Sequence, residues 1–321
     1  MVQNKRYIPF TILIMILMLD VGSCISAPGM TPVILTSSPT ARRVTTSPTP
    51  TPIDTFTPPP TVTFTSSPIP TLSIENAYSM FEELFLNDGN CPLPCWWGLV
   101  PGVSTFQDAQ ATLAPLSGMA TWNEVGVLKG MSRGHFYLSY PNETDDILLN
   151  IDFNTMPNKN EVSILYISSQ VLRGERDREP VYDNKKYLEL MGNYTLSSIF
   201  STYGKPGQIG LTVARSAESY GPTSMYLRLL YPKRGIYVKY IAKAVISGDQ
   251  ISGCASKSFI EMWLVLPSSD ISYWEQFFPD LDSDGTPLEE AIGISPDTFY
   301  QLFSEPTNRC LETPLSLWPG P

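Results

Sequence analysis

The sequence predicts an α+β fold made of two diverged units, each a helix followed by an antiparallel meander, with a signal peptide and a disordered stalk before them. Apolar residues at helical spacing precede segments in which apolar and polar residues alternate, as in half-buried strands. The same order returns about 90 residues later, and a tract of Ser, Thr and Pro precedes both units. The predicted boundaries are 1–23 for the signal peptide, 24–72 for the stalk, 73–180 for the first unit and 181–321 for the second.

The composition is typical of an exported protein. Only 16% of the 321 residues are charged, below the quarter that is usual in soluble domains, and 30 are Pro. The net charge of −10, from 21 basic and 31 acidic residues, does not provide the basic surface that binds a phosphate backbone. The composition therefore argues against a nucleic-acid partner.

The N-terminus carries an export signal. Lys5 and Arg6 form a basic start, and residues 7–19 form an apolar stretch of 13 residues. A membrane-spanning helix needs about 20 apolar residues, so this stretch is too short to span a bilayer. The sequence VGSC, which ends at Cys24, resembles the bacterial lipobox, whose cysteine is lipidated. This resemblance predicts an extracytoplasmic lipoprotein held at the membrane surface through Cys24; the alternatives are cleavage after Ala27 and an unmodified cysteine.

Residues 31–72 predict an extended stalk. Of these 42 residues, 28 are Ser, Thr or Pro, a composition that favours polyproline conformations and does not form an apolar core. At about 3.1 Å per residue, the tract would hold the folded part up to about 130 Å from the membrane. Its hydroxyl groups either carry O-linked sugar or form an unmodified spacer, and composition does not separate these alternatives.

The first unit opens with a helical pattern over residues 74–85. Its predicted inward face consists of Ile74, Tyr78, Phe81, Leu84 and Phe85. The segment 91–102 is rich in Pro and Gly, which predicts a rigid loop that places Trp96 and Trp97 against the core.

A second helix is predicted after Ser104 or Thr105, either of which can cap it. Its inward residues are Phe106, Ala109 and Leu113, and Pro115 ends it. Strand patterns at 146–153 and 161–167 complete the unit.

The second unit repeats this order. After Thr195, the residues Leu196, Ile199 and Tyr203 have the spacing of the inward residues of the preceding helix, and Gly204 follows them. Strand patterns come next at 225–231, 236–241 and 259–266. Because a helix followed by a hairpin is a common order, coincidence is the alternative to a repeat.

Two resemblances follow from these patterns. A helix that ends in a Gly-x-Pro-like turn and packs on a meander resembles small envelope-assembly lipoproteins of bacteria and the β-lactamase-inhibitor-like fold. The segment CPLPCWWG at 91–98, with the tail at 310–319, resembles uncharacterised bacterial surface lipoproteins that have Thr/Pro-rich stalks. The first resemblance implies a protein-binding or scaffold role without a cofactor, and neither implies catalysis.

Four cysteines follow Cys24: Cys91, Cys95, Cys254 and Cys310. An even number in an exported chain predicts two disulfides. We favour Cys91 with Cys95 and Cys254 with Cys310, and the crossed pairings are alternatives. A zinc site is a weaker alternative, because Cys254 and Cys310 lack the close spacing of zinc ribbons.

The sequence predicts no catalytic residues and no enzyme. The single histidine, His135, is expected at a strand edge or on the surface rather than as a base, and no His-Glu-x-x-His or phosphate-binding Gly-rich loop occurs. A secreted two-carboxylate hydrolase is the alternative. The adjacent pairs Asp145-Asp146 and Glu289-Glu290 support it only weakly, because neighbouring side chains diverge in direction.

The acidic segment at 280–285 is the candidate metal site. Asp280, Asp282 and Asp284 alternate before Gly285, as in the first half of an EF-hand loop, which predicts weak Ca²⁺ binding. The twelfth position is Ala291 instead of Glu, and a solvated acidic turn is the alternative reading.

Five tryptophans of the folded part are predicted to pack in the core, with stacking on sugar rings as the alternative. They are Trp96, Trp97, Trp263, Trp274 and Trp318. Together these observations predict a lipid-anchored, disulfide-stabilised surface protein that displays a non-catalytic binding or scaffold domain. Its partner would be an extracellular protein or a glycan.

Overall fold

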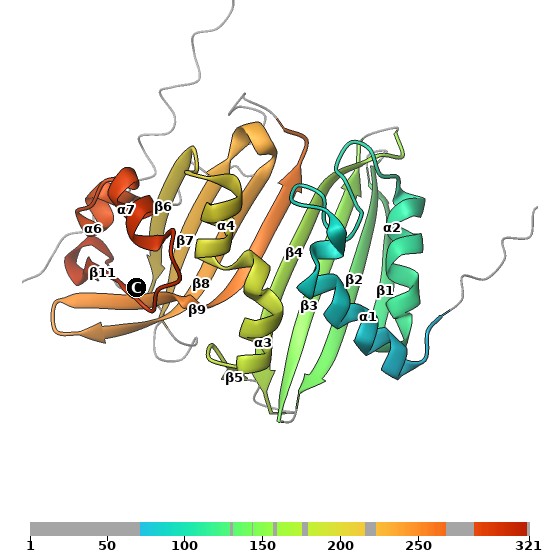
Figure 1. The fold of residues 1–321 in the computed structure, drawn as a ribbon, viewed down its shortest axis with the longest axis horizontal. Helices are drawn as coiled ribbons and strands as arrows, with labels where there is room; N and C mark the ends of the chain where they lie inside the picture. The colour runs from blue at the N-terminus through green and yellow to red at the C-terminus, as the bar shows by residue number, and fades with distance from the viewer. Residues whose placement is uncertain are drawn as a thin grey trace, which may run out of the picture. The chain divides into compact units, whose positions relative to one another are not determined.

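The computed structural model describes residues 71–128, 131–142, 144–156, 159–174, 179–215, 223–267 and 286–319. These residues form an α+β fold in which helices pack on an antiparallel sheet (Figure 1). The predicted signal peptide, Cys24 and nearly all of the predicted stalk lie outside the described residues, so their predictions stay untested.

The sheet contains eleven strands among the described residues. Its main path runs β1-β2-β3-β4-β9-β8-β7-β6-β10, while β5 pairs with β4 and β11 with β9. Two four-stranded meanders, β1 to β4 and β6 to β9, therefore meet where β4 pairs with β9. The strands are β1 (Ala120–Leu128), β2 (Met131–Asn142), β3 (Asp145–Thr155), β4 (Val162–Arg173), β5 (Glu179–Pro180), β6 (Gln208–Ala214), β7 (Ser224–Tyr231), β8 (Ile236–Ser247), β9 (Gln250–Val265), β10 (Thr286–Pro287) and β11 (Leu311–Pro314).

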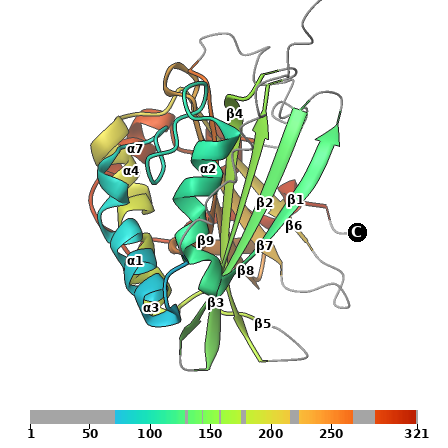
Figure 2. The ribbon, with the colours of Figure 1, turned by 90° about the vertical axis from the view of Figure 1, so that its right-hand side faces the viewer.

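Most of the helices lie on one face of this sheet. They are α1 (Ile74–Leu86), α2 (Phe106–Leu113), α3 (Lys185–Leu190), α4 (Leu196–Tyr203), α6 (Leu288–Ile292) and α7 (Pro296–Phe303). Figure 2 shows α1, α2, α3, α4 and α7 on the same side of the sheet. Because side chains alternate between the two faces of a strand, the residues facing these helices form the main core.

One row of that core can be followed across the sheet by register. Each of its members is buried: Phe136, Ile151, Ile167, Met262, Val238 and Leu229. These residues belong to a single apolar cluster that also contains side chains of α1, α2, α3 and α4. The two meanders therefore share one core.

The predicted helices are found, with one error in the first. In α1 the buried residues are Ala77, Phe81 and Phe85, whereas Ile74 is 45% exposed. The prediction for Ile74 was wrong because burial depends on what lies beneath the helix, and this residue stands at its first position.

The helices α2 and α4 match their predictions closely. Thr105 caps α2 and Thr195 caps α4, in each case by accepting a hydrogen bond from the backbone three residues later. All the predicted inward residues of both helices are buried. The α-helix ends before Pro115, and a 3₁₀ turn continues from Ala114 to Met119.

Candidate functional site

The face of the sheet opposite the helices carries a row of aromatic and charged side chains, which we call the aromatic face. Register places Asp152 beside Tyr166, Tyr166 beside Trp263, and Trp263 beside Tyr237 on four adjacent strands. His135 continues the row on β2. Directly opposed residues of antiparallel strands share a face, so all five side chains project on the same side.

The rings of this row pack against one another at an angle. The ring centroids of Tyr166 and Trp263 are 4.7 Å apart, with the planes tilted by 32°, and those of Trp263 and Tyr237 are 4.8 Å apart, with the planes tilted by 42°. These distances equal the spacing between strands, so neighbouring rings are in contact along the row. Burial, followed by the charge of Glu261, raises the pKa of Tyr166, which keeps its hydroxyl protonated as a hydrogen-bond donor.

The neighbouring row holds an ion pair between Lys239 and Glu261. The Lys239 Nζ atom lies 5.1 Å from the ring centroid of Trp263 and 5.5 Å from that of Tyr226, a cation–π arrangement. The side chains of Lys239 and Glu261 are only 21% and 18% exposed. Both charged groups are therefore largely removed from water before any partner binds. Binding of a partner over this pair would add little further desolvation cost.

His135 forms a charged cluster at the other end of the row. Its Nδ1 atom lies 3.0 Å from Asp152 Oδ1, and because a carboxylate only accepts, Nδ1 carries the proton. Arg133 Nη2 lies 3.4 Å from the same oxygen. His135 is 30% exposed. In the described part of the chain, its hydrogen bond goes to this carboxylate rather than to a hydroxyl or thiol nucleophile.

A hollow of about 390 Å³ continues the row beyond Tyr237. Its lining includes Leu230 and Arg228 from β7 and Glu289 from α6, so it combines an apolar wall with one charge of each sign. Arg228 also donates a hydrogen bond to Thr212 Oγ1 at 3.0 Å. The hollow is large enough to receive one or two side chains of a bound molecule.

The cysteines pair in the connectivity that their spacing favours. Cys91 is bonded to Cys95 within the loop that follows α1, and Cys254 in β9 is bonded to Cys310, which precedes β11. With all four cysteines paired, none is left as a thiolate for the alternative zinc site.

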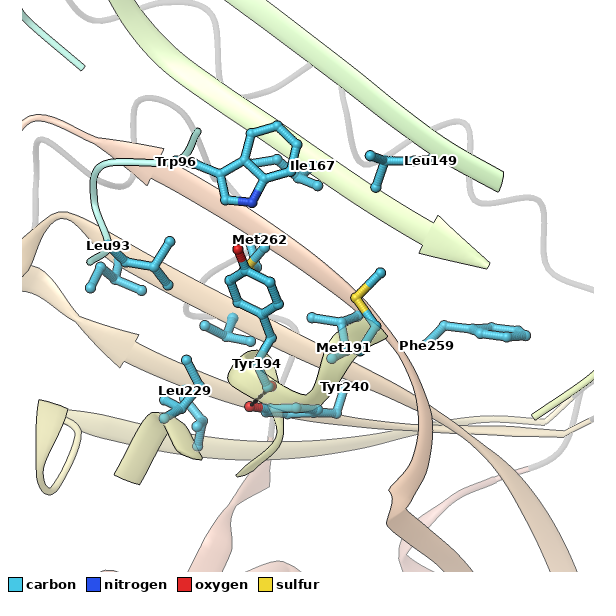
Figure 3. Close-up of a cluster of buried hydrophobic side chains, with 14 of the residues drawn as sticks. Leu93, Trp96, Leu149, Ile167, Met191, Tyr194, Leu229, Tyr240, Phe259 and Met262 are labelled. Atoms are coloured by element: carbon cyan, nitrogen blue, oxygen red, sulfur yellow. Dashed lines mark hydrogen bonds between the residues drawn. The ribbon is translucent and has the colours of Figure 1, made fainter. Parts of the chain in front are cut away.

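Trp96 and Trp97 pack in the core, as their loop predicts. Their rings stack at 3.8 Å, and Phe85 packs edge-on against both. Figure 3 shows the indole nitrogen of Trp96 facing the hydroxyl of Tyr194, whose backbone oxygen accepts a hydrogen bond from Tyr240 at 3.0 Å. Trp318 is buried as well. Trp263 is thus the only one of the predicted tryptophans that the described residues place on the aromatic face.

The carboxylate pairs considered for hydrolysis lie on different elements. Asp145 at the start of β3 accepts hydrogen bonds from Arg173 and Asn184, at 2.7 Å and 2.8 Å, while Glu289 lines the hollow beside β6. The hydrogen bond from Arg173 lowers the pKa of Asp145, against the opposing effect of burial. Asp145 is therefore an ionised structural carboxylate.

The candidate Ca²⁺ ligands Asp280, Asp282 and Asp284 lie outside the described residues, so this prediction stays untested. Within the described ranges, no group of three or more His, Cys, Asp or Glu side chains is arranged to hold a metal ion. The same ranges contain no helix long and apolar enough to cross a membrane.

The sequence interpretation missed most of the aromatic face. Tyr166 and Lys239 lay inside predicted strands but were not assigned to a site, and Trp263 was considered only for stacking on sugar rings. Along these strands, aromatic or charged side chains alternate with apolar ones. This alternation could have indicated the aromatic face, because the solvent-facing side of an antiparallel sheet usually carries only polar residues. Comparisons with protein families, with curated proteins and with solved structures found no match.

Proposed function

We propose that the chain is a lipid-anchored surface protein whose folded part is a non-catalytic binding domain, and that the aromatic face contacts a protein partner. One observation carries the binding role. A row of Tyr and Trp side chains whose rings pack against one another, flanked by a partly desolvated ion pair, crosses the sheet on the face opposite the helices. Aromatic anchors surrounded by charged groups are the composition of strong protein–protein contacts.

The geometry favours a protein over a glycan. A sugar ring stacks on the exposed face of an aromatic side chain. In this row the ring of Trp263 packs against Tyr166 and Tyr237, with ring planes tilted by 32° and 42°, and Lys239 lies over it. These neighbours limit the surface of the indole on which a sugar ring could stack.

The proposal includes two diverged units, residues 73–180 and 181–321. It is supported by the equal length of α2 and α4, by their threonine caps, and by the four-stranded meander that follows each helix. Joining the last strands of both meanders produces a wider face than either could offer alone. Within each unit, a helix that packs on a meander is what resemblance to the β-lactamase-inhibitor-like fold implies.

The anchor rests on the sequence. The VGSC motif at 21–24 and the stalk to residue 72 support lipidation of Cys24 and display of the domain away from the membrane. Intact mass of the native protein, extracted from membranes with detergent, tests this step. Residues 24–321 with acyl groups are expected, and an unacylated chain cleaved after Ala27 would contradict the anchor.

An exchange of charges tests the binding step. The double variant Lys239→Glu with Glu261→Lys keeps the composition and the ion pair but reverses its direction on the aromatic face. We expect its affinity for the captured partner to fall by about tenfold or more, since misplaced charges at an interface are costly. The matched control, Lys186→Glu with Glu82→Lys, exchanges a pair that joins α3 and α1, 3.1 Å apart. Equal loss in both variants would contradict the assignment of the face.

A further inference from the structure

A second hollow, of about 370 Å³, lies away from the aromatic face between the end of α4 and the turn that joins β7 to β8. Two turns shape it. After Tyr203, Gly204 adopts a φ of 75°, and the β7–β8 turn ends at Gly235 with a φ of 72°. The Gly207 backbone N–H donates to Leu230 O at 2.8 Å, which holds the two turns side by side. Both turns can be followed in Figure 1.

Two tyrosines form the apolar part of this hollow. The rings of Tyr203 and Tyr231 pack edge to face, with their centroids 6.1 Å apart. Each hydroxyl is fixed: Tyr203 Oη accepts from the Leu93 backbone N–H at 2.8 Å, and Tyr231 Oη donates to Gly204 O at 2.9 Å. The rings are therefore held in place before any ligand binds.

Three cations surround these rings, and among the described residues no acidic side chain lines the hollow. Arg234 lies over the ring of Tyr203, 5.5 Å from its centroid. Lys205 Nζ is 2.6 Å from Asp297, and Lys233 has no ion-pair partner in the described part of the chain. The whole chain has 31 acidic and only 21 basic residues, so its net charge disfavours the binding of anions. A local cluster of three basic side chains is therefore a feature that distinguishes this hollow.

We propose that this hollow binds the phosphate group of an organic phosphate. Lys233 supplies a point charge, and Arg234 supplies a planar fork of donors, the two ways in which proteins bind phosphate. A phosphate monoester carries a charge of about −1.5 to −2, whereas a carboxylate carries −1. The charges of Lys233 and Arg234 therefore balance a phosphate monoester better than a carboxylate. Pro232, with the small exposed parts of Tyr203 and Tyr231, contacts the apolar part of the ligand.

Calorimetric titration of the full chain in detergent with phenyl phosphate tests the proposal. We expect saturable binding at one site. The double variant Lys233→Ala with Arg234→Ala should weaken it by about tenfold or more, the effect of losing charge-assisted hydrogen bonds. The control Lys257→Ala with Arg309→Ala removes one Lys and one Arg that are exposed and lie outside the hollow, and it should change the affinity by less than about twofold.

Competition identifies the source of the phosphate. Glycerophosphoglycerol, the headgroup of phosphatidylglycerol, will displace phenyl phosphate efficiently if the natural ligand is a lipid phosphodiester. Inorganic phosphate and soluble monoesters will compete better if it is a soluble compound. Both results support the site. Absence of phenyl phosphate binding by the unaltered chain, or equal weakening in both double variants, would overturn it.

Discussion

At the scale of single residues, Asp145 connects strand and helix. Arg173 donates two hydrogen bonds to its carboxylate, and Asn184 donates a third. Asn184 in turn accepts from the Tyr187 backbone N–H at 2.9 Å and so caps α3. Because the Asp145 side chain is only 7% exposed, these partners replace the water that it loses on folding.

The variant Asp145→Asn should lower the free energy of unfolding by about 2 kcal/mol at neutral pH, the worth of hydrogen bonds to a charged group. The pKa of Asp145 is lowered in the folded state, so its carboxylate contributes stability above the unfolded pKa, and this contribution is lost as the pH falls through the folded pKa. Urea unfolding of both proteins from neutral to acidic pH checks this. The difference should shrink below about pH 4, and a difference that is constant with pH would contradict the assignment.

At the scale of elements, the two disulfides constrain loops of very different length. Cys91 and Cys95 are four residues apart, whereas 56 positions separate Cys254 from Cys310. The longer link ties the segment before β11 to β9, beside the pairing of Leu311 with Gly253. The chain-entropy model therefore predicts that the disulfide between Cys254 and Cys310 stabilises the fold more than the one between Cys91 and Cys95.

Replacing Cys254 and Cys310 with Ser should lower the free energy of unfolding by about 4 kcal/mol, and replacing Cys91 and Cys95 by about 2 kcal/mol, on the chain-entropy account. Chemical denaturation of both double variants under identical conditions shows which of them loses more free energy of unfolding. A larger loss for the short link would show that packing of the tryptophan loop outweighs loop entropy.

The elements also show which local patterns were informative. The threonine caps and apolar spacing of α2 and α4 were sufficient to predict both helices. The strand β2, which contains Gly134 and Pro141, was not predicted from the sequence. A Cβ at Gly134 would lie 2.4 Å from Phe153 Cζ, so this glycine makes room for a ring on the next strand. Such a requirement comes from packing between strands and has no local signature.

The aromatic face was less predictable than the helices for the same reason. Tyr166 and Trp263 are almost a hundred positions apart in sequence and meet only through the pairing of β4 with β9. Periodicity assigns each residue to a face of its own strand but does not specify which strands become neighbours. The disulfides were easier to predict from the sequence, because four cysteines allow few pairings.

At the scale of the whole molecule, the junction between β4 and β9 joins the two meanders. The strands pair from Ile164 with Val265 to Ser168 with Glu261. Beyond this point Ser169 Oγ donates to Ile260 O at 2.9 Å, and the Ile260 backbone N–H donates to Tyr187 Oη at 3.1 Å. A buried hydroxyl of α3 thus extends the hydrogen bonding where the strands no longer pair.

Removing this hydroxyl with Tyr187→Phe should lower the free energy of unfolding by about 1–3 kcal/mol, since it leaves buried polar groups without their partner. Because the meanders share one core, both proteins should unfold in a single transition by circular dichroism and by tryptophan fluorescence. Two separate transitions would show that the halves fold independently and that their shared core contributes little.

The proposed contact between the aromatic face and a protein forms when the chain is displayed at the cell surface. Site-specific photo-crosslinking in intact cells that produce the protein tests this most directly. A photoreactive amino acid would replace Tyr166 or His135 on the aromatic face, and Ser79 or Glu83 on the exposed side of α1 would serve as matched controls. The proposal predicts a discrete protein adduct from the face positions and none from α1. Adducts only from α1, or none from the face, would contradict it.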